Sequence, residues 1–355
     1  MGGGPKHLYN LLEHLNQEKY KAYVAAPKDG EFFEKFSKYA EVIECDIKHG
    51  YLSNLRKLER FIKEKKIDIV HSHGRGAGVY SRPLKKLCKG IKVVHTFHGI
   101  HYENKNIIVC AGIKTVEPVL CKMTDMAICV SEQEREEAVN MHFAERNKSV
   151  VIYNGVDSEN FQISLDVTEY RKQIGLTESD YVIGCVARLD KVKGHKELVE
   201  AFAKFVHVVP EAKLLLVGEG NQREEIENHI RQLKLSEKCI LLGAREDIPQ
   251  LLKCMDVFVL ASHKEALGYA PIEALAAGIP VIVSEVQGLT EVIQDDYNGM
   301  LFQTKDAESL FRCLLRMQNC EYKQSLIENA KLIVGEKFSV REMNKRIEEV
   351  YEQLS

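Results

Sequence analysis

Two successive series of short apolar runs, separated by stretches with helical periodicity, organise this chain of 355 residues. Short runs rich in Val, Ile and Leu and bounded by polar residues are typical of parallel strands that are buried on both faces, and the intervening helices provide the crossovers between them. The pattern therefore predicts an α/β protein with two doubly wound domains that face each other across a cleft. Domains of this kind bind ligands outside the carboxyl ends of their strands.

The order of the runs predicts the domain boundaries. The first series contains the strand-like runs KAYVAAP, AEVIEC, IDIVHSH, KVVHTFH and MAICVS, and the second contains YVIGCVAR, AKLLLVGEG, KCILLGA, VFVLAS and PVIVSE. After the run at 150–157 the sequence becomes polar and poor in strands. We expect one domain at 1–160, a second at 161–337, and a last helix at 338–355 that packs back toward the first domain. No strand-like run precedes the glycines at the start, so the first sheet is expected to lack its first strand.

Composition and charge narrow the class of protein. A net charge of -3 and a pI near 6.5 give no reason to expect nucleic-acid binding. Ten cysteines without a C-x-x-C pair indicate reduced core residues of a cytoplasmic protein. No apolar stretch approaches the roughly 18 residues that a bilayer crossing needs. The oligomeric state is left open by the sequence.

The charge is unevenly spread along the chain, and two segments are strongly basic. Residues 52–66 hold six Lys or Arg against two Glu, and residues 81–92 hold five against no acid. Both segments suit a solvated helix face. They also suit contact with anionic lipid or with a phosphorylated acceptor, so a peripheral contact with the cytoplasmic face of the inner membrane stays open.

Two carboxylates lie in the segment HKEALGYAPIEALAAGIPVIVSE, which joins two predicted strands. Pro271 is expected to begin a helix that Gly278 ends, which places Glu265 on the loop and Glu273 in the first helical turn. An ionised carboxylate has two acceptor oxygens and no donor, so each can accept hydrogen bonds from neighbouring hydroxyls of a sugar.

The segment VARLDKVKG lies between a predicted strand and the helix HKELVEAFAKF. Arg188 and Lys193 stand on the connecting loop ahead of a helix N-terminus, and Gly194 keeps the backbone free of side-chain bulk. A guanidinium fork, an ammonium and a helix N-terminus together suit a diphosphate. The alternative is an exposed basic loop without a ligand.

Two further loops follow strands in the second series. The segment VGEG contains Gly218 and Gly220, but Arg223 stands where a dinucleotide fingerprint has its third glycine, so we interpret the pair as a tight turn that lines the cleft. The loop at 243–248, which contains Arg245, could contact a nucleobase through its backbone or could be a simple turn into the next helix.

Glycines and histidines dominate the candidate sites of the first half. Gly3 and Gly4 precede a helix, so their N–H groups could approach a phosphate or a sugar. His7 is expected to be a surface or packing residue. His98 ends a strand, where it could donate to a sugar hydroxyl or to developing charge. The set of His95, His98 and His101, with the HSH run at 71–73, has no ligand spacing of a known metal site, and no metal is expected.

Several of these motifs together resemble glycosyltransferase family 4. They are G-G-G near the start, T-F-H-G at 96–99, A-R-L-D-K-V-K-G at 187–194, V-G-E-G at 217–220, and E-A-L-G followed by I-E-A-L-A-A-G-I-P-V-I. The likeness spans nearly the whole chain, with its more specific motifs in the second half. It implies a GT-B fold and a retaining transfer from a nucleotide diphosphate sugar, with a UDP-sugar as the expected donor.

The resemblance also implies roles for individual residues. Arg188 and Lys193 would hold the diphosphate and stabilise the leaving nucleotide, while Glu273 would bind the ribose. Glu265 would hold the donor sugar, and His98 would contact it near the reacting carbon. The residues expected at the donor are Gly3, Gly4, Arg188, Lys193, Gly218, Arg245, Glu265, Ala266, Leu267, Gly268 and Glu273, and those expected to act in catalysis are Glu265, His98, Arg188 and Lys193.

The residues fit a reaction without a metal cofactor. Departure of a nucleotide diphosphate develops negative charge that fixed cations and helix dipoles can stabilise. No D-x-D occurs in the sequence, so the usual carboxylate motif of metal-dependent sugar transferases is missing. The expected acceptor is a saccharide or lipid-linked saccharide of the cell envelope.

Two other functions suit the same architecture. A sugar-nucleotide 2-epimerase would need acid and base carboxylates on both sides of the sugar, and the first half shows no convincing pair. An inactive nucleotide-sugar binder from a truncated gene is the other alternative. The sequence leaves the sugar, the linkage and the acceptor open, because a few hydroxyl contacts decide them.

Overall fold

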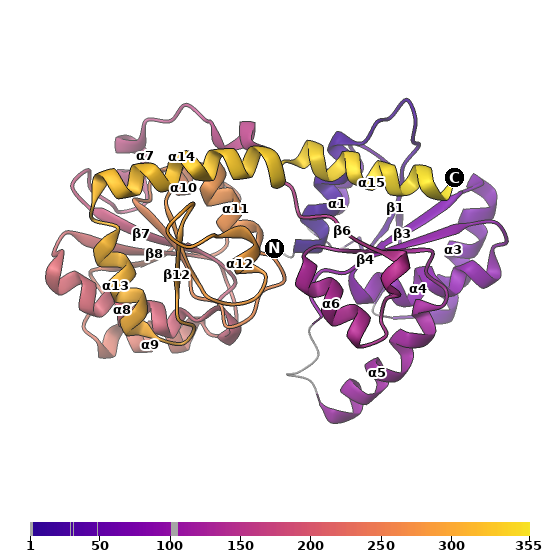
Figure 1. Cartoon of the computed structure of the whole chain (residues 1–355), viewed down its shortest axis with the longest axis horizontal. Helices are drawn as coiled ribbons and strands as arrows, with labels where there is room; N and C mark the ends of the chain where they lie inside the picture. Colours follow the sequence, from indigo (N-terminus) through magenta and orange to yellow (C-terminus); the bar gives the residue numbers. More distant parts are fainter. Residues whose placement is uncertain (1–2, 29, 31, 48, 101–105) are drawn as a thin grey trace. The chain divides into compact units, whose positions relative to one another are not determined.

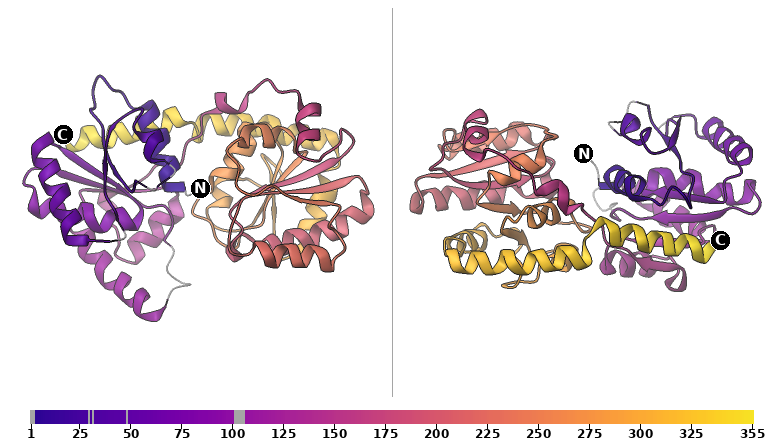
Figure 2. Two further views of the ribbon diagram at one scale, coloured as in Figure 1. Left: turned by 180° about the vertical axis from the view of Figure 1, so that it is seen from behind. Right: turned by 90° about the horizontal axis from the view of Figure 1, so that it is seen from above.

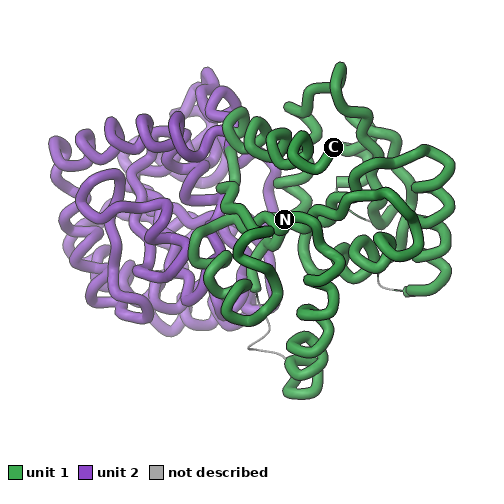
Figure 3. Tube along the Cα trace, turned by 45° about the vertical axis from the view of Figure 1, so that its right-hand side comes forward, with its two compact units in different colours: residues 1–155, 340–355 green, residues 156–339 purple. Residues whose placement is uncertain are grey.

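The computed structural model describes residues 3–28, 30, 32–47, 49–100 and 106–355 of the chain. The chain divides into two compact units (Figure 3). Unit 1 comprises Met1–Gly155 and Val340–Ser355, and unit 2 comprises Val156–Ser339. The sequence had placed these transitions after residues 160 and 337. Both units are α/β, as the alternating runs predicted.

Unit 2 is built on one continuous sheet of six parallel strands in the order β12-β11-β10-β7-β8-β9. The strands are β7 (Tyr181–Val186), β8 (Ala212–Val217), β9 (Cys239–Leu241), β10 (Val257–Leu260), β11 (Val281–Ser284) and β12 (Met300–Phe302). Every residue of β10 and β11 is buried, because helices cover both faces of the sheet (Figure 2). The strand order also places β7, the first strand of the unit, in the interior of the sheet between β10 and β8.

The helices of unit 2 connect these strands as crossovers. They are α7 (Val167–Gln173), α8 (His195–Val208), α9 (Arg223–Gln232), α10 (Ile248–Lys253), α11 (Tyr269–Ala276), α12 (Leu289–Val292), α13 (Ala307–Arg316) and α14 (Cys320–Lys337), with 3-10 turns η2 (Ser158–Phe161) and η3 (Lys191–Lys193). Helix α8 packs against α9 and α13, whereas α11 packs against α14.

Unit 1 contains two separate parallel sheets among its described residues. One consists of β1 (Tyr23–Ala26) and β2 (Glu41–Glu44), and the other has β3 (Ile69–His73), β4 (Lys92–Thr96), β5 (Met126–Cys129) and β6 (Ser149–Val151) in that order. Within the described residues, the strands of unit 1 therefore do not form one continuous sheet. Strands β2 and β3 are largely half-buried or exposed, unlike β10 and β11 of unit 2.

Helices pack on these sheets and complete unit 1 (Figure 1). They are α1 (Gly3–His14), α2 (Phe33–Phe36), α3 (Tyr51–Lys65), α4 (Gly74–Leu87), α5 (Ile107–Cys121), α6 (Glu132–Asn140) and α15 (Val340–Leu354), with the 3-10 turn η1 (Arg146–Lys148). The last helix, α15, packs against α1, and the Asn344 side chain donates to the Leu11 carbonyl at 2.8 Å. Ile347 and Leu11 share one apolar cluster with strands β4 and β5.

The structure corrects three details of the sequence prediction. The strands β6 and β12, each three residues long, were not predicted, because so short a run carries little periodicity. Helix α11 begins at Tyr269 instead of Pro271, since a proline is tolerated in the first turn, where N–H groups have no partner within the helix. Glu273 is therefore the fifth residue of α11. Within the described part of the chain, no helix is both long and apolar enough to cross a membrane.

Candidate functional site

Four loops at the carboxyl ends of the unit 2 strands are joined by backbone hydrogen bonds. Gly218, after β8, donates to the carbonyl of Gly243, after β9, at 2.8 Å. The loop after β10 is joined to the loop after β7, because His263 donates to the Val192 carbonyl at 2.7 Å. The loop after β7 also accepts from the loop after β8, with Gln222 donating to Leu189 at 2.8 Å. The loops that carry the predicted donor residues therefore form one connected rim.

Two glycines allow this close approach of backbones. Gly194 has a φ of 65°, and a Cβ there would lie 1.9 Å from the Ala261 carbonyl oxygen. Gly218 has a φ of 141°, and a Cβ there would lie 1.9 Å from the Ala187 carbonyl oxygen. Any side chain at either position would collide with backbone, so both loops depend on glycine for their shape.

Lys193 and Glu265 meet at the centre of this rim. The Lys193 ammonium contacts the Glu265 Oε2 atom, which also accepts from the Ser262 hydroxyl at 3.3 Å. Their side chains are 16% and 15% exposed, so a ligand in the rim could still reach both. The structure thus brings together the residue predicted for the diphosphate and the residue predicted for the donor sugar.

Glu273 follows Glu265 in the same segment of the sequence, but its side chain is more enclosed than those of Lys193 and Glu265. It belongs to α11 and is only 4% exposed. Leu267, in the loop ahead of α11, is fully buried, and Gly268 takes a φ of 84° just before the helix begins. The first N–H groups of a helix lack intrahelical partners and carry a positive partial charge, so the 266–268 backbone opens onto an anion-binding terminus.

Arg188 is the most exposed of the predicted donor residues. Its side chain is 59% exposed, and its Nη1 atom lies 2.7 Å from the Asp190 carboxylate. An exposed pair of this kind exchanges easily for another anion, because water screens it. The guanidinium is therefore accessible to a ligand beside the end of β7.

Arg245 has a different environment from the one expected. Its guanidinium forms a bidentate pair with Asp247, at 2.8 and 2.5 Å, and its Nη2 atom lies 3.4 Å from the Tyr170 hydroxyl. Hydrogen bonding to Arg245 holds the pKa of Asp247 near 2. The Arg245 guanidinium is thus paired with other side chains of the protein. A nucleobase could still be contacted by the backbone of this loop.

In unit 1, His98 belongs to a cluster of histidines in which His7 is buried and His73 and His98 are half-buried. Its Nε2 atom lies 3.3 Å from Nδ1 of His73, and its ring centroid lies 4.9 Å from that of His7. Burial, followed by the nearby histidines, lowers the pKa of His98 well below its usual value. A Cβ at Gly4 would lie 3.3 Å from the His98 ring, so Gly4 lets the start of α1 approach His98 closely.

His7 and His95, two other histidines of unit 1, lie in its interior. His7 is fully buried, and its Nδ1 atom donates to the Asn154 side chain at 2.9 Å. Within the described ranges, no group of three His, Cys, Asp or Glu side chains is arranged to hold a metal ion. His101 lies outside the described residues.

Glu134 is a buried structural carboxylate that the sequence analysis missed. Its carboxylate accepts from the Gly99 N–H at 2.5 Å and from the Val130 N–H at 2.8 Å, and it is 4% exposed. It therefore joins the loop that carries His98 to the loop after β5. The signal was the S-x-x-E spacing with Ser131, because Ser131 caps α6 by accepting from the Glu134 N–H at 3.1 Å.

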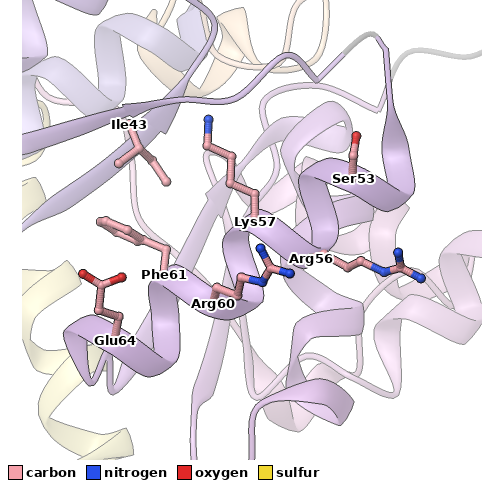
Figure 4. A pocket seen from close by; sticks show the side chains of 7 residues that line it. All are labelled: Ile43, Ser53, Arg56, Lys57, Arg60, Phe61 and Glu64. Carbon is pink, nitrogen blue, oxygen red and sulfur yellow. The ribbon is translucent and has the colours of Figure 1, made fainter.

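The two basic segments of unit 1 differ in what they expose. In 81–92, Arg82 is fully buried against Glu117, so the expectation that this segment presents all its cations to a partner is wrong for Arg82. In 52–66, a hollow of about 420 Å³ opens between β2 and α3 (Figure 4). It is lined by Ile43, Ser53, Arg56, Lys57, Arg60, Phe61 and Glu64. For residues 52–66, both a solvated helix face and contact with an anionic partner stay open.

Comparison with known proteins places the two halves of the chain in related families. Residues 1–160 match the model of Glycosyltransferase Family 4, and residues 166–333 match that of Glycosyl transferases group 1. The uncharacterised glycosyltransferase MJ1607 of Methanocaldococcus jannaschii is 30% identical over 300 residues, which are 81% of this chain and 75% of that protein.

Two further comparisons concern a characterised relative and a solved structure. A UDP-Gal:α-D-GlcNAc-diphosphoundecaprenol α-1,3-galactosyltransferase of Escherichia coli is 29% identical over 306 residues, covering 84% of this chain and 79% of that protein. The crystal structure of Anabaena HepE in complex with UDP and glucose has a TM-score of 0.87 at 23% identity, covering 99% of this chain and 96% of that one. At this identity the likeness shows a shared fold, GT-B.

Proposed function

Because the chain belongs to the glycosyltransferases, with a family 4 region ahead of a group 1 region, we propose that it transfers a hexose or N-acetylhexosamine from a UDP-sugar. The acceptor we propose is a saccharide or lipid-linked saccharide used in cell-envelope glycan synthesis. The E. coli relative, by its name, uses UDP-galactose and a diphosphoundecaprenol-linked sugar, which supports both assignments. The alternative of a sugar-nucleotide 2-epimerase is not favoured, because the related proteins described above are transferases.

One observation carries the proposal for the donor. In unit 2, the loops after β7, β8, β9 and β10 are joined at one edge of the sheet, and the contact between Lys193 and Glu265 lies on that rim. A nucleotide diphosphate sugar offers both an anion and vicinal hydroxyls, so it matches a cation and a carboxylate that lie side by side. Glu273, which is enclosed on α11, is the proposed partner of the ribose.

The charges suit the departure of a nucleotide diphosphate. As the bond between the anomeric carbon and the phosphate oxygen breaks, negative charge grows on the diphosphate, and Arg188 and Lys193 would stabilise it. Lys193 contacts Glu265, so a diphosphate bound at Lys193 would replace one anionic partner of the ammonium by another. Glu265 would then be released to accept from sugar hydroxyls. We propose that this reaction retains the anomeric configuration and needs no metal ion.

Two further parts of the proposal concern the residues of unit 1 and the cellular location of the protein. We retain Gly3, Gly4 and His98 as residues that serve the donor, tested by loss of turnover in a His98→Ala variant. We also propose that the chain works in the cytoplasm or at the cytoplasmic face of a membrane. The ten cysteines of the sequence form no C-x-x-C pair, which suits reduced core residues in a reducing compartment.

The experiment is an assay of the purified chain with a panel of UDP-, GDP- and ADP-sugars, with and without saccharide acceptors. Glu265→Ala should abolish most of the transfer but leave affinity for free UDP nearly unchanged, since Glu265 is assigned to the sugar. Glu211→Ala is the matched control, because this exposed carboxylate precedes β8 at the other end of the strands. Transfer in the presence of EDTA tests metal independence.

Three outcomes would contradict parts of the proposal. A new nucleotide sugar formed without any acceptor would indicate an epimerase. Binding of a donor without turnover against any acceptor or water would indicate an inactive binder. Equal losses of UDP affinity in Glu265→Ala and Glu273→Ala would reject the division of roles between the two carboxylates.

A further inference from the structure

The rings of His73 and His98 in unit 1 are joined by a hydrogen bond between their nitrogen atoms. His73 Nδ1 lies 3.3 Å from His98 Nε2, and the ring centroids lie 5.6 Å apart. The second distance exceeds the first by about two ring radii, so both nitrogen atoms lie close to the line between the ring centres. The lone pair or N–H of an imidazole nitrogen points away from the ring centre, so the two atoms face each other as a hydrogen bond requires. Although the ring planes differ by only 23°, the rings therefore meet edge to edge and are not stacked.

The neighbouring side chains do not compete for this bond. The His71 ring lies 4.3 Å from that of His73, but its Nδ1 and Nε2 atoms are engaged by the hydroxyls of Tyr351 at 2.6 Å and Thr96 at 2.7 Å. Within the described part of the chain, no other hydrogen bond reaches Nδ1 of His73 or Nε2 of His98. The two nitrogens are thus partners of each other.

Packing holds the His98 ring in this orientation. The His7 ring stands edge-on to it at a centroid distance of 4.9 Å, and a Cβ at Gly4 would lie 3.3 Å from its Cδ2 atom. His98 is half-buried, and among the described residues no hydrogen bond engages its Nδ1 atom. Because Nε2 is occupied by His73, Nδ1 is the nitrogen of His98 that is left for a ligand.

Both rings of the pair are neutral near pH 7. Burial, followed by the nearby histidines, lowers the pKa of His73 and that of His98 well below the usual value. A neutral imidazole has one N–H and one lone pair, so one ring of the pair donates and the other accepts. If His98 donates, both rings carry their proton on Nε2. If His73 donates, both carry it on Nδ1.

The first of these two arrangements is the more stable. Nε2–H is the commoner tautomer of a neutral histidine side chain, and the hydrogen bond made by one nitrogen decides which tautomer a ring adopts. When His98 donates, both rings have the commoner form. In the opposite arrangement both have the rarer form, and no described group bonds Nδ1 of His98 to compensate for it.

We propose that His73 is a positioning residue for His98: it accepts the Nε2–H of His98 and leaves the Nδ1 lone pair of His98 to accept a hydrogen bond from a hydroxyl of the donor sugar. The ligand in this inference rests on the proposed function, whereas the tautomer is a property of the chain without ligand. His98 thus acts as an acceptor and not as the donor considered from the sequence. A hydroxyl can donate to this lone pair, whereas a carboxylate at the same position cannot.

Nuclear magnetic resonance tests the tautomer without any ligand. With ¹⁵N-labelled histidine rings, a long-range proton–nitrogen spectrum at neutral pH should show His98 protonated on Nε2 and bare on Nδ1, and His73 in the same form. His98→Gln assigns the His98 signals by their loss. A proton on the Nδ1 atom of His98 would overturn the proposal, whatever the activity of the chain.

Substitutions of His73 test the positioning. His73→Leu removes the acceptor, so the His98 ring should become a mixture of both tautomers. His73→Asn places an amide oxygen near the position of the lost Nδ1 atom and should keep His98 in the Nε2–H form, whereas the longer side chain of His73→Gln should not. Unchanged His98 signals in His73→Leu would contradict the assignment.

Turnover with a UDP-sugar connects the tautomer to function. His73→Leu should lower kcat roughly threefold to tenfold, as expected for one neutral hydrogen bond, and leave the Kd for UDP unchanged. His73→Asn should recover most of kcat, and His73→Gln should not. His207→Leu is the control, because His207 is exposed in the last turn of α8, at the opposite end of that helix from the loop after β7. Thermal unfolding of each variant separates positioning from loss of the fold.

Two kinetic outcomes would overturn the positioning role. One is an unchanged kcat in His73→Leu, and the other is recovery by His73→Gln as complete as that by His73→Asn. A chain that turns over no UDP-sugar would contradict the proposed function instead, and the resonance measurements would still decide whether His73 sets the tautomer of His98.

Discussion

Unit 1 and unit 2 share one type of fold but differ in how continuous their sheets are. In unit 2 the first strand, β7, lies between β10 and β8, and six strands form one sheet. In unit 1 helix α1 comes before any described strand, and the strands form sheets of two and four. A strand with neighbours on both sides and helices on both faces is fully buried, as β10 and β11 are in unit 2, whereas the apolar core of unit 1 is divided among several clusters.

The two units also differ in what they bury. The buried polar and charged side chains of unit 2 are His195, Ser262, Glu273, Ser284 and Asn298. Unit 1 buries more of them within its described residues, including Arg82, Glu117, Glu134, His7 and His95. A buried polar group contributes to stability only while its partner and its protonation state are right. Unit 1 should therefore respond more strongly to loss of partners and to acid.

The largest expected effect concerns the buried pair between α4 and α5. Glu117→Gln leaves the Arg82 guanidinium buried with a weaker partner, and loss of one member of such a pair typically costs about 3 to 5 kcal/mol. Chemical denaturation should show this loss. Replacing both residues by methionine should recover most of the stability, and a double variant as unstable as the single one would contradict this explanation.

A pair of strand substitutions sharpens the comparison of the two cores. Leu260→Ala in β10, where the side chain is 1% exposed, should destabilise unit 2 by about 2 to 5 kcal/mol. Ile43→Ala in β2, where the side chain is half-buried, should cost about 1 kcal/mol. Similar losses in the two variants would show that the division of the unit 1 sheet has little energetic consequence.

Nucleotide affinity offers a third way to distinguish the functions of the two units. Glu273→Gln should weaken UDP binding about tenfold to a hundredfold, since a hydrogen bond to a charged group contributes roughly 1.5 to 3 kcal/mol. Glu134→Gln, which alters a buried carboxylate of unit 1, should leave UDP affinity unchanged. Titration calorimetry can measure both, and a matching loss in Glu134→Gln would break the assignment of the nucleotide to unit 2.

Acid should also distinguish the two units, and unit 1 should respond to it first. Burial lowers the pKa of His7 to about 4, so His7 stays neutral in the folded chain while the unfolded chain takes up a proton below pH 6.5. Stability therefore falls as the pH drops from 6.5 toward 4, by at most about 1.4 kcal/mol for each pH unit and each such histidine. His71, with a pKa of about 3, adds to the effect.

Hydrogen exchange at pH 7.0 and 5.5 can locate this loss. Amides of unit 1 should lose protection at the lower pH before those of unit 2, where His195 is the histidine lowered to about 4. His7→Gln should reduce the pH dependence. Simultaneous loss of protection in both units would contradict the prediction.

Strand-end motifs were predicted well because their chemistry is local. The sequence placed Arg188, Lys193 and Glu265 on loops after strands, and the structure has them there. It did not predict that Lys193 contacts Glu265, nor that Asp247 takes the Arg245 guanidinium. Pairings of this kind depend on side-chain directions from loops that are distant in sequence, and local pattern carries no information about them.

Glu134 and α5 are two further features that local sequence patterns could not predict. The Ser131 cap was readable from S-x-x-E, but the bond from Glu134 to Gly99 joins residues 35 positions apart. The sequence analysis did not single out the apolar residues of α5, and only the position of the neighbouring elements leaves Ile107 and Ile108 exposed.

What the sequence determined by itself is the class of fold, the family and the order of the loops, because hydrophobic periodicity, glycines and strand-end motifs act over short distances. The tertiary structure decided which residues meet, which histidines lose their charge, and which apolar surface stays uncovered. These properties depend on burial, and burial is set by the packing of elements that lie far apart in the chain.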